Sequence, residues 1–416
     1  MLTGHDIVLI SSIDWEFNWQ GHQEIATRLA AAGNRVLYIE NMGVRTPRLH
    51  DARRVVQRFF HWAGSLPDGG VRQVSPGLYV CSPLILPPFG SALRRHVNRR
   101  VLFPFLLRAV ERLHFKPDVI WTFLPTDTAT DLVRVFKKKP SVVVYYCIAD
   151  FVELSPHRNE ILSSEHVTIE LSDVVFAQCP NLAERCSVAG REAHVFPFGV
   201  NMSRFANEKL RANGSAHCAT AIPSLCSATT FMSELPRPVI GYVGGIHKYV
   251  DTQMLAAMAR ARPEWSWVLV GPSQTSVREL KRIPNIYLAG PKAHRELPHY
   301  IRDFDVGIVP YKSNGYTATV VPTKINEYLA VGKPVVSTDL PEVIAFNDRH
   351  DIIITSPNHA SQFIASIEKA LDASTENEVV DRRQTVAALN DWDACFDRMT
   401  ELIERALQQK QVANEF

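Results

Sequence analysis

Short apolar runs alternate with longer amphipathic stretches along almost the whole chain, and this alternation limits the possible folds more than any other feature. Asp6–Ser11 and Arg35–Glu40 are apolar runs of strand length, whereas Gly21–Ala32 between them has the length and periodicity of a helix. Chains that alternate in this way form βα units, in which helices cover a parallel sheet. We therefore predict an α/β fold.

The alternation lapses once, between about Ala206 and Arg237, and begins again at Pro238. A chain of 416 residues is also longer than a single core usually grows. We predict a Rossmann-like N-terminal domain over residues 1–205, a linker or insert over 206–237, a second Rossmann-like domain over 238–385, and a C-terminal helix over 386–416 that packs towards the first domain. Two such domains are expected to face a cleft, with ligands near the carboxyl ends of the strands.

The composition excludes several classes of protein. The chain is 46% hydrophobic and 21% charged with a formal net charge of +2, so no global field attracts nucleic acid. Its seven cysteines are scattered without a zinc-binding spacing, which favours buried or free thiols in a reducing cytoplasm. We find no signal peptide and no run of about 18 apolar residues. We expect a cytoplasmic protein without a metal cofactor.

One segment, from Pro322 to Val336, has the pattern of an anion-binding helix followed by a strand. Pro322 and Thr323 suit a helix opening in which Thr323 acts as the cap, and Lys324 adds positive charge to the first turn. A cation there opposes the helix dipole unless an anion is bound, and Glu327, one turn further on, could accept hydrogen bonds from ribose hydroxyls. A plain amphipathic helix before a strand remains an alternative.

The residues P-x-K-x-x-E-Y-L-A-x-G-K-P-V-V of this segment resemble the donor site of retaining GT-B glycosyltransferases of the family 4 type. The resemblance implies that Glu327 binds the nucleotide ribose, that Thr323 and Lys324 lie near the diphosphate, and that no metal is needed. The family has a second Glu eight residues before the first, where this chain has Thr319. That departure leaves the donor sugar open. The residues expected around the sugar are Tyr311, Thr319, Val320 and Val321.

The turn after the first strand of the second domain supports the same resemblance. Gly244 and Gly245 follow the strand, and Lys248 comes shortly after them. A pair of glycines lets the backbone approach a phosphate, and a lysine could neutralise its charge. Turns between strands and helices often contain glycine, so a purely structural turn is the alternative.

Acceptor residues are predicted in the first half of the chain. The loop that contains Trp15, Trp19 and Gln20 resembles the Trp-rich variant found in polysaccharide and teichuronic-acid-type glycosyltransferases. These side chains could stack on a sugar and bind it by hydrogen bonds, although one tryptophan could belong to the core. Asp150 ends a strand and is the candidate to orient or deprotonate an acceptor hydroxyl. Its alternative role is a helix N-cap.

Residues 94–108 are locally basic and apolar. They could lie on anionic membrane lipids, with arginines at the headgroups and apolar side chains dipping in. A core helix whose start is solvated by arginine is the alternative. Membrane contact would make this a peripheral protein at the inner face of the plasma membrane.

The resemblance implies a hexosyltransferase-type enzyme of bacterial cell-surface polysaccharide or glycoconjugate biosynthesis. It would move a sugar from a nucleotide donor to a saccharide or lipid-linked acceptor, with Asp150 and Lys324 as catalytic residues and without nucleic acid as a partner. Two alternatives remain. One is a nucleotide-sugar epimerase with the same fold. The other is a catalytically degenerate scaffold subunit, which the Thr319 departure motivates.

Overall fold

The computed structural model describes residues 2–40, 70–89, 92–188, 191–206, 231–372 and 376–415. The chain divides into two compact units: unit 1 comprises Met1–Phe196 with Phe396–Phe416, and unit 2 comprises Pro197–Cys395. The boundary therefore lies after Phe196 rather than at residue 205. Most of the predicted linker, residues 207–230, lies outside the described residues.

Unit 1 is built on an eight-stranded sheet in the order β3-β4-β2-β1-β5-β6-β7-β8, in which only β3 pairs antiparallel. Its central strands are apolar on both faces; Ile7 to Ile10 of β1 are fully buried, as expected for a parallel sheet covered by helices. The strands are β1 (Asp6–Ile10), β2 (Arg35–Ile39), β3 (Val71–Ser75), β4 (Leu78–Cys81), β5 (Val119–Thr122), β6 (Val142–Cys147), β7 (Val174–Ala177) and β8 (Ala193–Val195).

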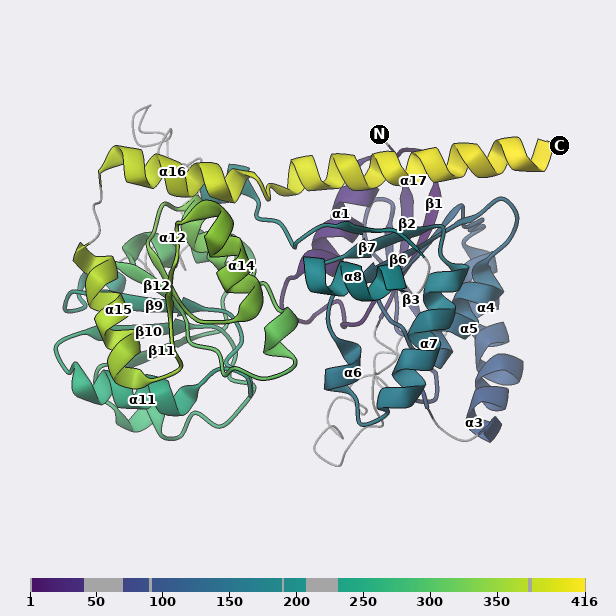
Figure 1. Ribbon diagram of the computed structural model, residues 1–416. Coiled ribbons are helices and arrows are strands. Elements are labelled where there is room, and N and C mark those ends of the chain that lie inside the picture. The colour runs from purple at the N-terminus through teal and green to yellow at the C-terminus, as the bar shows by residue number, and fades with distance from the viewer. Residues whose placement is uncertain are drawn as a thin grey trace. The chain divides into compact units, whose positions relative to one another are not determined.

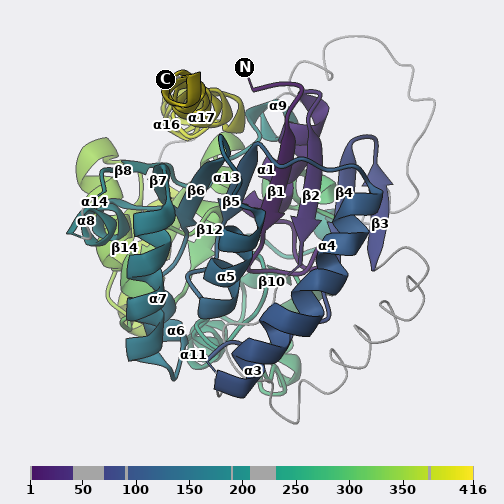
Figure 2. The ribbon, with the colours of Figure 1, turned by 90° about the vertical axis from the view of Figure 1, so that its right-hand side faces the viewer.

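The helices of unit 1 connect these strands, and α4, α5 and α7 lie side by side along one face of the sheet (Figure 2). The sequence also predicts a helix over Ala92–Phe115 that is kinked or split at Pro104; the structure has three joined pieces there, with a π-helical turn, η3, between two α-helices. The helices are α1 (Gly21–Ala31), α3 (Ala92–Val97), η3 (Asn98–Leu102), α4 (Phe103–Arg112), α5 (Asp127–Phe136), α6 (Phe151–Leu154), α7 (Arg158–Leu171) and α8 (Pro180–Val188).

Unit 2 has a six-stranded, wholly parallel sheet in the order β11-β10-β9-β12-β13-β14. The strand order reverses at β9: β10 and β11 lie on one side of it, and β12, β13 and β14 lie on the other. Parallel sheets bind ligands at such switch points. The strands are β9 (Val239–Val243), β10 (Ser266–Val270), β11 (Ile286–Gly290), β12 (Val306–Val309), β13 (Val335–Thr338) and β14 (Ile354–Ser356).

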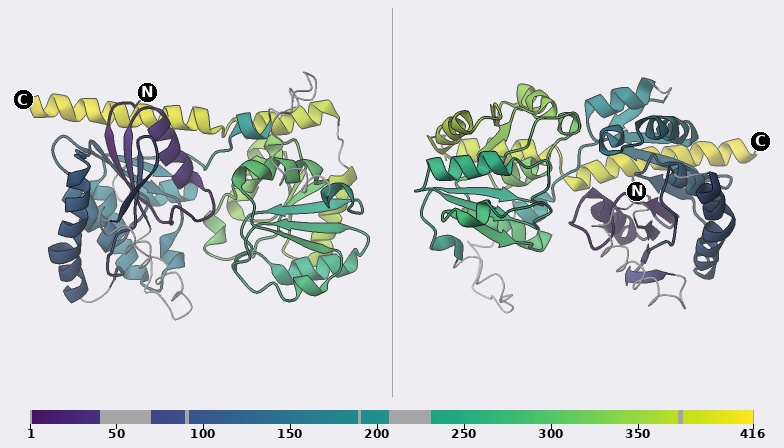
Figure 3. Two further views of the ribbon diagram at one scale, coloured as in Figure 1. Left: turned by 180° about the vertical axis from the view of Figure 1, so that it is seen from behind. Right: turned by 90° about the horizontal axis from the view of Figure 1, so that it is seen from below.

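Helices and short helical turns follow the strands of unit 2. Figures 1 and 3 show these strands lying between helices. The α-helices are α9 (Met202–Phe205), α11 (Thr252–Ala261), α12 (Leu297–Asp303), α13 (Lys324–Ala330), α14 (Pro341–His350), α15 (Ala360–Asp372) and α16 (Asn377–Ala388). The 3-10 turns are η4 (Leu280–Arg282), η5 (His294–Glu296) and η6 (Thr317–Thr319).

The C-terminal helix α17 (Trp392–Glu415) begins later than residue 386, because residues up to Ala388 belong to α16. From Phe396 onward its residues belong to unit 1, where Lys410 Nζ contacts Asp173 Oδ2 at 2.5 Å and the Ser141 carbonyl at 2.7 Å. No helix within the described ranges has the length and hydropathy needed to cross a membrane.

Candidate functional site

The turn that follows β9 brings the backbone of unit 2 close to a lysine far along the chain. Gly244 has φ +119, a conformation that glycine adopts readily, and a Cβ built on it would lie 3.2 Å from Lys324 Cε. The neighbouring turn after β10 packs so tightly here that a Cβ on Gly271 would lie 2.1 Å from the Gly244 carbonyl oxygen. Two of the predicted donor-site elements are therefore in direct contact.

Among the residues that the structure describes, aromatic and hydroxyl groups hold the buried cation of Lys324. Its side chain is 8% exposed, and Nζ donates a hydrogen bond of 2.6 Å to the Tyr311 hydroxyl. The ammonium also lies 4.8 Å from the Tyr311 ring centroid and 5.2 Å from that of Tyr242. Within the described parts of the chain, no carboxylate pairs with it. A buried charge without a counter-charge is costly, so this position suits a bound anion.

His247, which sequence reasoning did not single out, lies beside this lysine. Its ring is 5.3 Å from that of Tyr311, and the loop that carries it pairs with Tyr311 through Val250. Burial, and then the charges of Lys324 and Lys248, lower the pKa of His247 to about 4. The imidazole is thus neutral at pH 7. Lys248 itself is exposed, with Nζ 4.7 Å from the Tyr249 ring.

The start of α13 differs from the expectation in one respect. Thr323 has helical backbone angles and its side chain makes no capping hydrogen bond, so the predicted cap is wrong. The reason is local: Ile325 N already donates to the Pro322 carbonyl at 3.0 Å, so the helical turn starts one residue earlier than expected. The end of α13 follows the sequence pattern, with Gly332 at φ +82 and its carbonyl bound by Arg383.

Glu327 takes part in a hydrogen-bonded chain of three side chains in unit 2. Arg204 Nη1 lies 3.1 Å from His294 Nδ1, and His294 Nε2 lies 3.0 Å from Glu327 Oε1. Because a guanidinium can only donate, Nδ1 must accept, so the proton of neutral His294 is on Nε2 and is donated to the carboxylate. Glu327 is therefore held as an oriented acceptor. Neither partner was found from the sequence, because both are distant along the chain.

The segment predicted to surround the donor sugar leads from β12 into α13. Tyr311 opens it and contacts Lys324 directly, as described above. Thr319 ends the 3-10 turn η6, and its hydroxyl donates to the Tyr316 carbonyl at 3.1 Å. Val320 and Val321 follow and are half-buried. These last three residues lie on the connection to Lys324.

In unit 1, the loop after β1 presents one packed and one exposed tryptophan. The Trp15 ring lies 5.1 Å from that of Tyr38, and its backbone N–H donates to the buried Glu40 at 2.9 Å. Trp19 is exposed, although its indole N–H donates to Glu24 at 2.8 Å. Gln20 is the N-cap residue of α1. The loop therefore offers Trp19 to a ligand more openly than Trp15.

Asp150 has the capping role that was its alternative. Its carboxylate accepts from Val152 N at 3.0 Å and Glu153 N at 3.3 Å at the start of α6. It also pairs with Arg185 at 2.8 Å, and Arg185 binds the buried Glu165 at 3.0 Å. One cation is thus balanced by two carboxylates. A catalytic role for Asp150 remains a prediction.

Residues 94–108 combine a buried and an exposed surface. Phe103 and Leu106 of α4 are buried in unit 1, which agrees with a core helix, whereas Val101 and Phe105 are exposed.

No group of three or more His, Cys, Asp or Glu side chains in the described ranges is placed to hold a metal ion. Asp303 and Asp305, which form an Asp-x-Asp sequence, precede β12, and Asp305 is bound to Arg237 and Val239 N.

Parts of the chain match known protein sequences. A family model described as glycosyl transferases group 1 matches residues 237–373, within unit 2. A teichuronic acid biosynthesis glycosyltransferase of Bacillus subtilis, TuaH, is 36% identical over 162 residues. That match covers 38% of this chain and 41% of the relative's length.

Solved structures resemble the chain over nearly its whole length. Sucrose-phosphate synthase of Thermosynechococcus elongatus superposes with a TM-score of 0.68 at 16% identity, covering 97% of this chain and 99% of that one. Anabaena HepE in complex with UDP-glucose gives a TM-score of 0.62 at 13% identity, covering 96% and 100%. At such low identity these likenesses concern the fold. Residues 237–373 are therefore a glycosyl transferases group 1 domain, and the chain that contains them has the two-domain GT-B fold.

Proposed function

We propose that this protein is a glycosyltransferase that moves a sugar from a nucleotide-sugar donor to a hydroxyl of a saccharide or lipid-linked acceptor. The observation that carries the proposal is Lys324: a buried ammonium beside the Gly244 turn, held by Tyr311 and without a carboxylate partner in the described structure. A diphosphate would supply the missing negative charge. The group 1 domain match and the UDP-glucose complex of HepE support a nucleotide sugar as the source of that diphosphate.

The donor is expected to be bound by unit 2 alone. The backbone of Gly244 and Gly245, with Lys324, Lys248 and the turn at Thr323, would contact the diphosphate. Glu327, oriented by His294, would accept hydrogen bonds from the ribose. The sugar would lie near Tyr311 and the connection that contains Thr319, Val320 and Val321.

These residues are expected to contribute to catalysis mainly by electrostatic stabilisation of the leaving diphosphate. When the bond between the anomeric carbon and the diphosphate oxygen breaks, negative charge develops on the diphosphate. A fixed ammonium aimed at that oxygen stabilises the transition state more than the ground state, and a buried site strengthens the effect. We propose that Lys324 has this role, without a metal ion, and that the configuration at the anomeric carbon is retained.

The acceptor is expected to lie in unit 1, near Trp19, Trp15 and Gln20, with Asp150 orienting its hydroxyl. The likeness to a protein named for teichuronic acid biosynthesis supports a cell-surface polysaccharide or glycoconjugate as the product. We propose that the reaction takes place in the cytoplasm, at the inner face of the plasma membrane.

The test is a thermal-shift measurement with UDP, GDP and dTDP on the wild type, Lys324→Met and a control, Lys369→Met, in which an exposed lysine of α15 is changed. Saturating ligand at about 100 times Kd stabilises a protein by about 2.7 kcal/mol. We expect one nucleotide to stabilise the wild type and Lys369→Met but not Lys324→Met. No stabilisation by any nucleotide would contradict the proposal and favour a scaffold subunit.

Turnover then distinguishes transfer from epimerisation. The nucleotide sugar that matches the stabilising base is incubated with and without a saccharide acceptor. A transferase releases the nucleoside diphosphate and extends the acceptor, whereas conversion of the nucleotide sugar into its epimer without any acceptor would contradict transfer.

A further inference from the structure

The helical stretch from α3 to α4 has a surface that the transfer reaction does not use. No Asp or Glu occurs from Ala92 to Val110, but five arginines do: Arg94, Arg95, Arg99, Arg100 and Arg108. Large apolar side chains are exposed on the same stretch, with Leu93 at 70%, Val101 at 59% and Phe105 at 42%. These three belong to a series spaced by four residues, Leu93, Val97, Val101 and Phe105, which places them about one turn apart.

The π-helical turn η3 lies in the middle of this surface. Its first residue, Asn98, is buried and fixes the turn by binding both the N–H and the carbonyl of Leu86, at 2.9 and 3.0 Å. The next three residues, Arg99, Arg100 and Val101, are all exposed. Turns of this kind are frequent at functional sites. Here the turn presents two guanidinium groups and an apolar side chain together.

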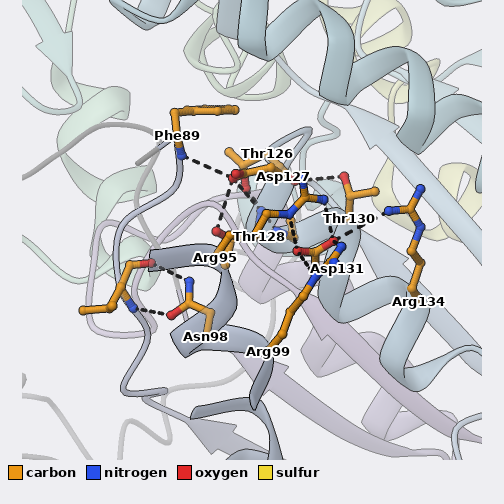
Figure 4. Close-up of polar contacts among 12 residues, drawn as sticks. Phe89, Arg95, Asn98, Arg99, Thr126, Asp127, Thr128, Thr130, Asp131 and Arg134 are labelled. Carbon is orange, nitrogen blue, oxygen red and sulfur yellow. Dashed lines mark hydrogen bonds and ion pairs between the residues drawn. The ribbon is translucent and has the colours of Figure 1, made fainter. Parts of the chain in front are cut away.

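Beneath this surface, one buried carboxylate organises three arginines (Figure 4). Asp131 of α5, whose side chain is 2% exposed, is bound by Arg95 through Nε and Nη2, both at 2.8 Å. Arg99 binds the same carboxylate through Nε at 2.8 Å and Nη2 at 2.5 Å, and Arg134 Nη1 lies 3.6 Å from it. The three arginine side chains remain 42 to 47% exposed.

The charges in this cluster are unequal. Burial raises the pKa of Asp131, but the hydrogen bonds from Arg95 and Arg99 outweigh burial and keep the pKa below its usual value, so the group is anionic. Asp127, whose charge also acts on Arg95, is nearby and bound by Phe89 N and Thr128. Three guanidinium groups therefore face two carboxylates. Nη1 of Arg95 and of Arg99 donates to no acceptor in the described structure, which leaves an edge of each for an outside anion.

A purely structural clamp between α3 and α5 explains part of this arrangement. A single bidentate arginine on Asp131 would join the two helices. It would not account for Arg94, Arg100 and Arg108, which have no carboxylate partner in the described ranges, or for the exposed Leu93 and Val101. Basic groups that surround exposed apolar side chains on one helical surface are typical of proteins that lie on anionic lipid.

We propose that the surface formed by α3, η3 and α4 docks on an anionic phospholipid bilayer. Arg94 and Arg100, with the exposed edges of the Asp131-held arginines, bind headgroup phosphates by charge-assisted hydrogen bonds. Leu93, Val101 and Phe105 enter the interfacial region. Asp131 acts as a positioning residue that fixes Arg95 and Arg99 in an array. The proposal concerns a partner of unit 1 and stands apart from the transfer reaction assigned above.

The test is co-sedimentation of the full chain with vesicles of phosphatidylcholine alone and with added phosphatidylglycerol. An arginine near an anionic surface changes the affinity about fivefold, so Arg94→Gln/Arg100→Gln should weaken binding to phosphatidylglycerol vesicles about 25-fold. The matched control, Arg158→Gln/Arg405→Gln, removes two other exposed arginine charges of unit 1 and should bind as the wild type does. Equal binding by both double variants would overturn the proposal.

The apolar contribution is tested separately with Leu93→Ser/Val101→Ser. Both side chains are exposed, so this variant should keep the Tm of the wild type while its vesicle affinity falls at least tenfold. Equal binding of the wild type to vesicles with and without phosphatidylglycerol would overturn the proposal. So would loss of wild-type vesicle binding in 10 mM inorganic phosphate at fixed ionic strength, which would identify a site for the free anion instead. Nucleotide-induced stabilisation, measured on the same variants, should not change. Failure of the membrane proposal can therefore be distinguished from failure of the transfer proposal.

Discussion

Each unit of the protein holds a cation away from most of the solvent, and the two cations have opposite surroundings. Arg185 of unit 1 lies between Asp150 and Glu165, at 2.8 and 3.0 Å, and the second of these carboxylates also accepts the Tyr145 hydroxyl at 2.6 Å. Lys324 of unit 2 has the hydroxyl of Tyr311 and two aromatic rings. The charge of Arg185 is neutralised by two carboxylates, whereas that of Lys324 has no carboxylate partner among the described residues.

The difference in surrounding charge indicates that Arg185 belongs to a structural ion cluster, whereas Lys324 occupies a position suited to binding an anion. A cation with two carboxylates has no electrostatic reason to bind a further anion, and its removal leaves two carboxylates without a counter-charge, of which Glu165 is buried and Asp150 is half-buried. A cation that the protein leaves uncompensated destabilises the empty protein and stabilises any complex that brings an anion. Buried charge alone therefore does not indicate a ligand site; the balance of charge around it does.

The largest effect is expected from Arg185→Met. Removal of the cation from this largely buried ion cluster leaves Asp150 and Glu165 without a counter-charge, and we expect the free energy of unfolding to fall by about 3 kcal/mol, the lower end of the range for fully buried pairs. Urea denaturation monitored by circular dichroism would measure this. Lys324→Met, in contrast, should change the stability of the nucleotide-free protein by less than about 1 kcal/mol, because an uncompensated charge is lost. If both variants lose equal stability, the contrast between the two cations is wrong.

The next effect is a dependence on pH that arises beside Lys324. Burial and the two lysine charges hold the folded-state pKa of His247 at about 4, below its ordinary value of 6.5. The unfolded chain therefore takes up the proton first, so this contribution to stability is present above about pH 6.5 and is lost as the pH falls towards 4. At pH 5 the loss, measured as the difference between wild type and His247→Gln in denaturant titrations, should be about 1–2 kcal/mol.

Lys324→Met sharpens this measurement, because it removes one of the charges that lower the pKa of His247. The acid-induced loss of stability attributed to His247 should then become smaller. The diphosphate of a bound nucleotide should also raise the pKa of His247, because its negative charge opposes that of Lys324. Binding at pH 5 should then be accompanied by proton uptake. Calorimetry in buffers of different ionisation enthalpy would measure that uptake. Binding without proton uptake would place the anion elsewhere.

A smaller effect is expected at His294, which positions Glu327. His294→Gln keeps a donor but loses the fixed geometry of the three-residue chain, and nucleotide affinity should fall by about 1 kcal/mol, roughly fivefold. The loss should be specific for the ribose: wild type and variant should bind the 2′,3′-dideoxy form of the stabilising nucleotide equally. If affinity for both forms falls alike in calorimetric titrations, Glu327 does not contact the ribose.

The smallest effect is expected from Tyr311→Phe, which removes the hydroxyl that accepts from Lys324 Nζ. The nucleotide-free variant should lose about 0.5–1 kcal/mol of stability, because the ammonium then has no oxygen partner in the described structure. With saturating nucleotide the difference should shrink, since phosphate oxygens replace the hydroxyl. Thermal unfolding with and without nucleotide tests this, and an unchanged difference would show that the anion does not reach Lys324.

Most of the fold followed from local patterns. Strand-length apolar runs such as those of β1 and β9, and the Gly332-Pro334 end of α13, are visible because each depends on neighbours along the chain. Two details of the fold differ from the prediction. The domain boundary lies after Phe196, and the helix over Ala92–Phe115, expected to kink or split at Pro104, is interrupted just before it by a π-helical turn, which depends on the distant loop residue Leu86 bound by Asn98.

The candidate site was predictable only in part, for the same physical reason. The contact of Lys324 with the Gly244 turn agrees with two predicted motifs, but the partners of these residues lie on other elements. Nothing near Asp150 in the sequence indicates Arg185, and nothing near Glu327 indicates His294. Side-chain pairs across elements are set by tertiary packing, so a sequence names the chemical groups and leaves their partners open.

The way the chain enters and leaves unit 2 has a consequence for biosynthesis. Val200 N donates to the Asn390 carbonyl at 2.9 Å and Trp392 N to the Val200 carbonyl at 3.0 Å, so the entering and leaving segments lie side by side. Unit 2 is thus an insertion within unit 1, and unit 1 is completed by Phe396–Phe416. During translation, unit 2 can fold as soon as it leaves the ribosome. The eight strands of unit 1 are synthesised before unit 2, but α17, with Lys410 bound to Asp173, can pack against unit 1 only after unit 2 has been made.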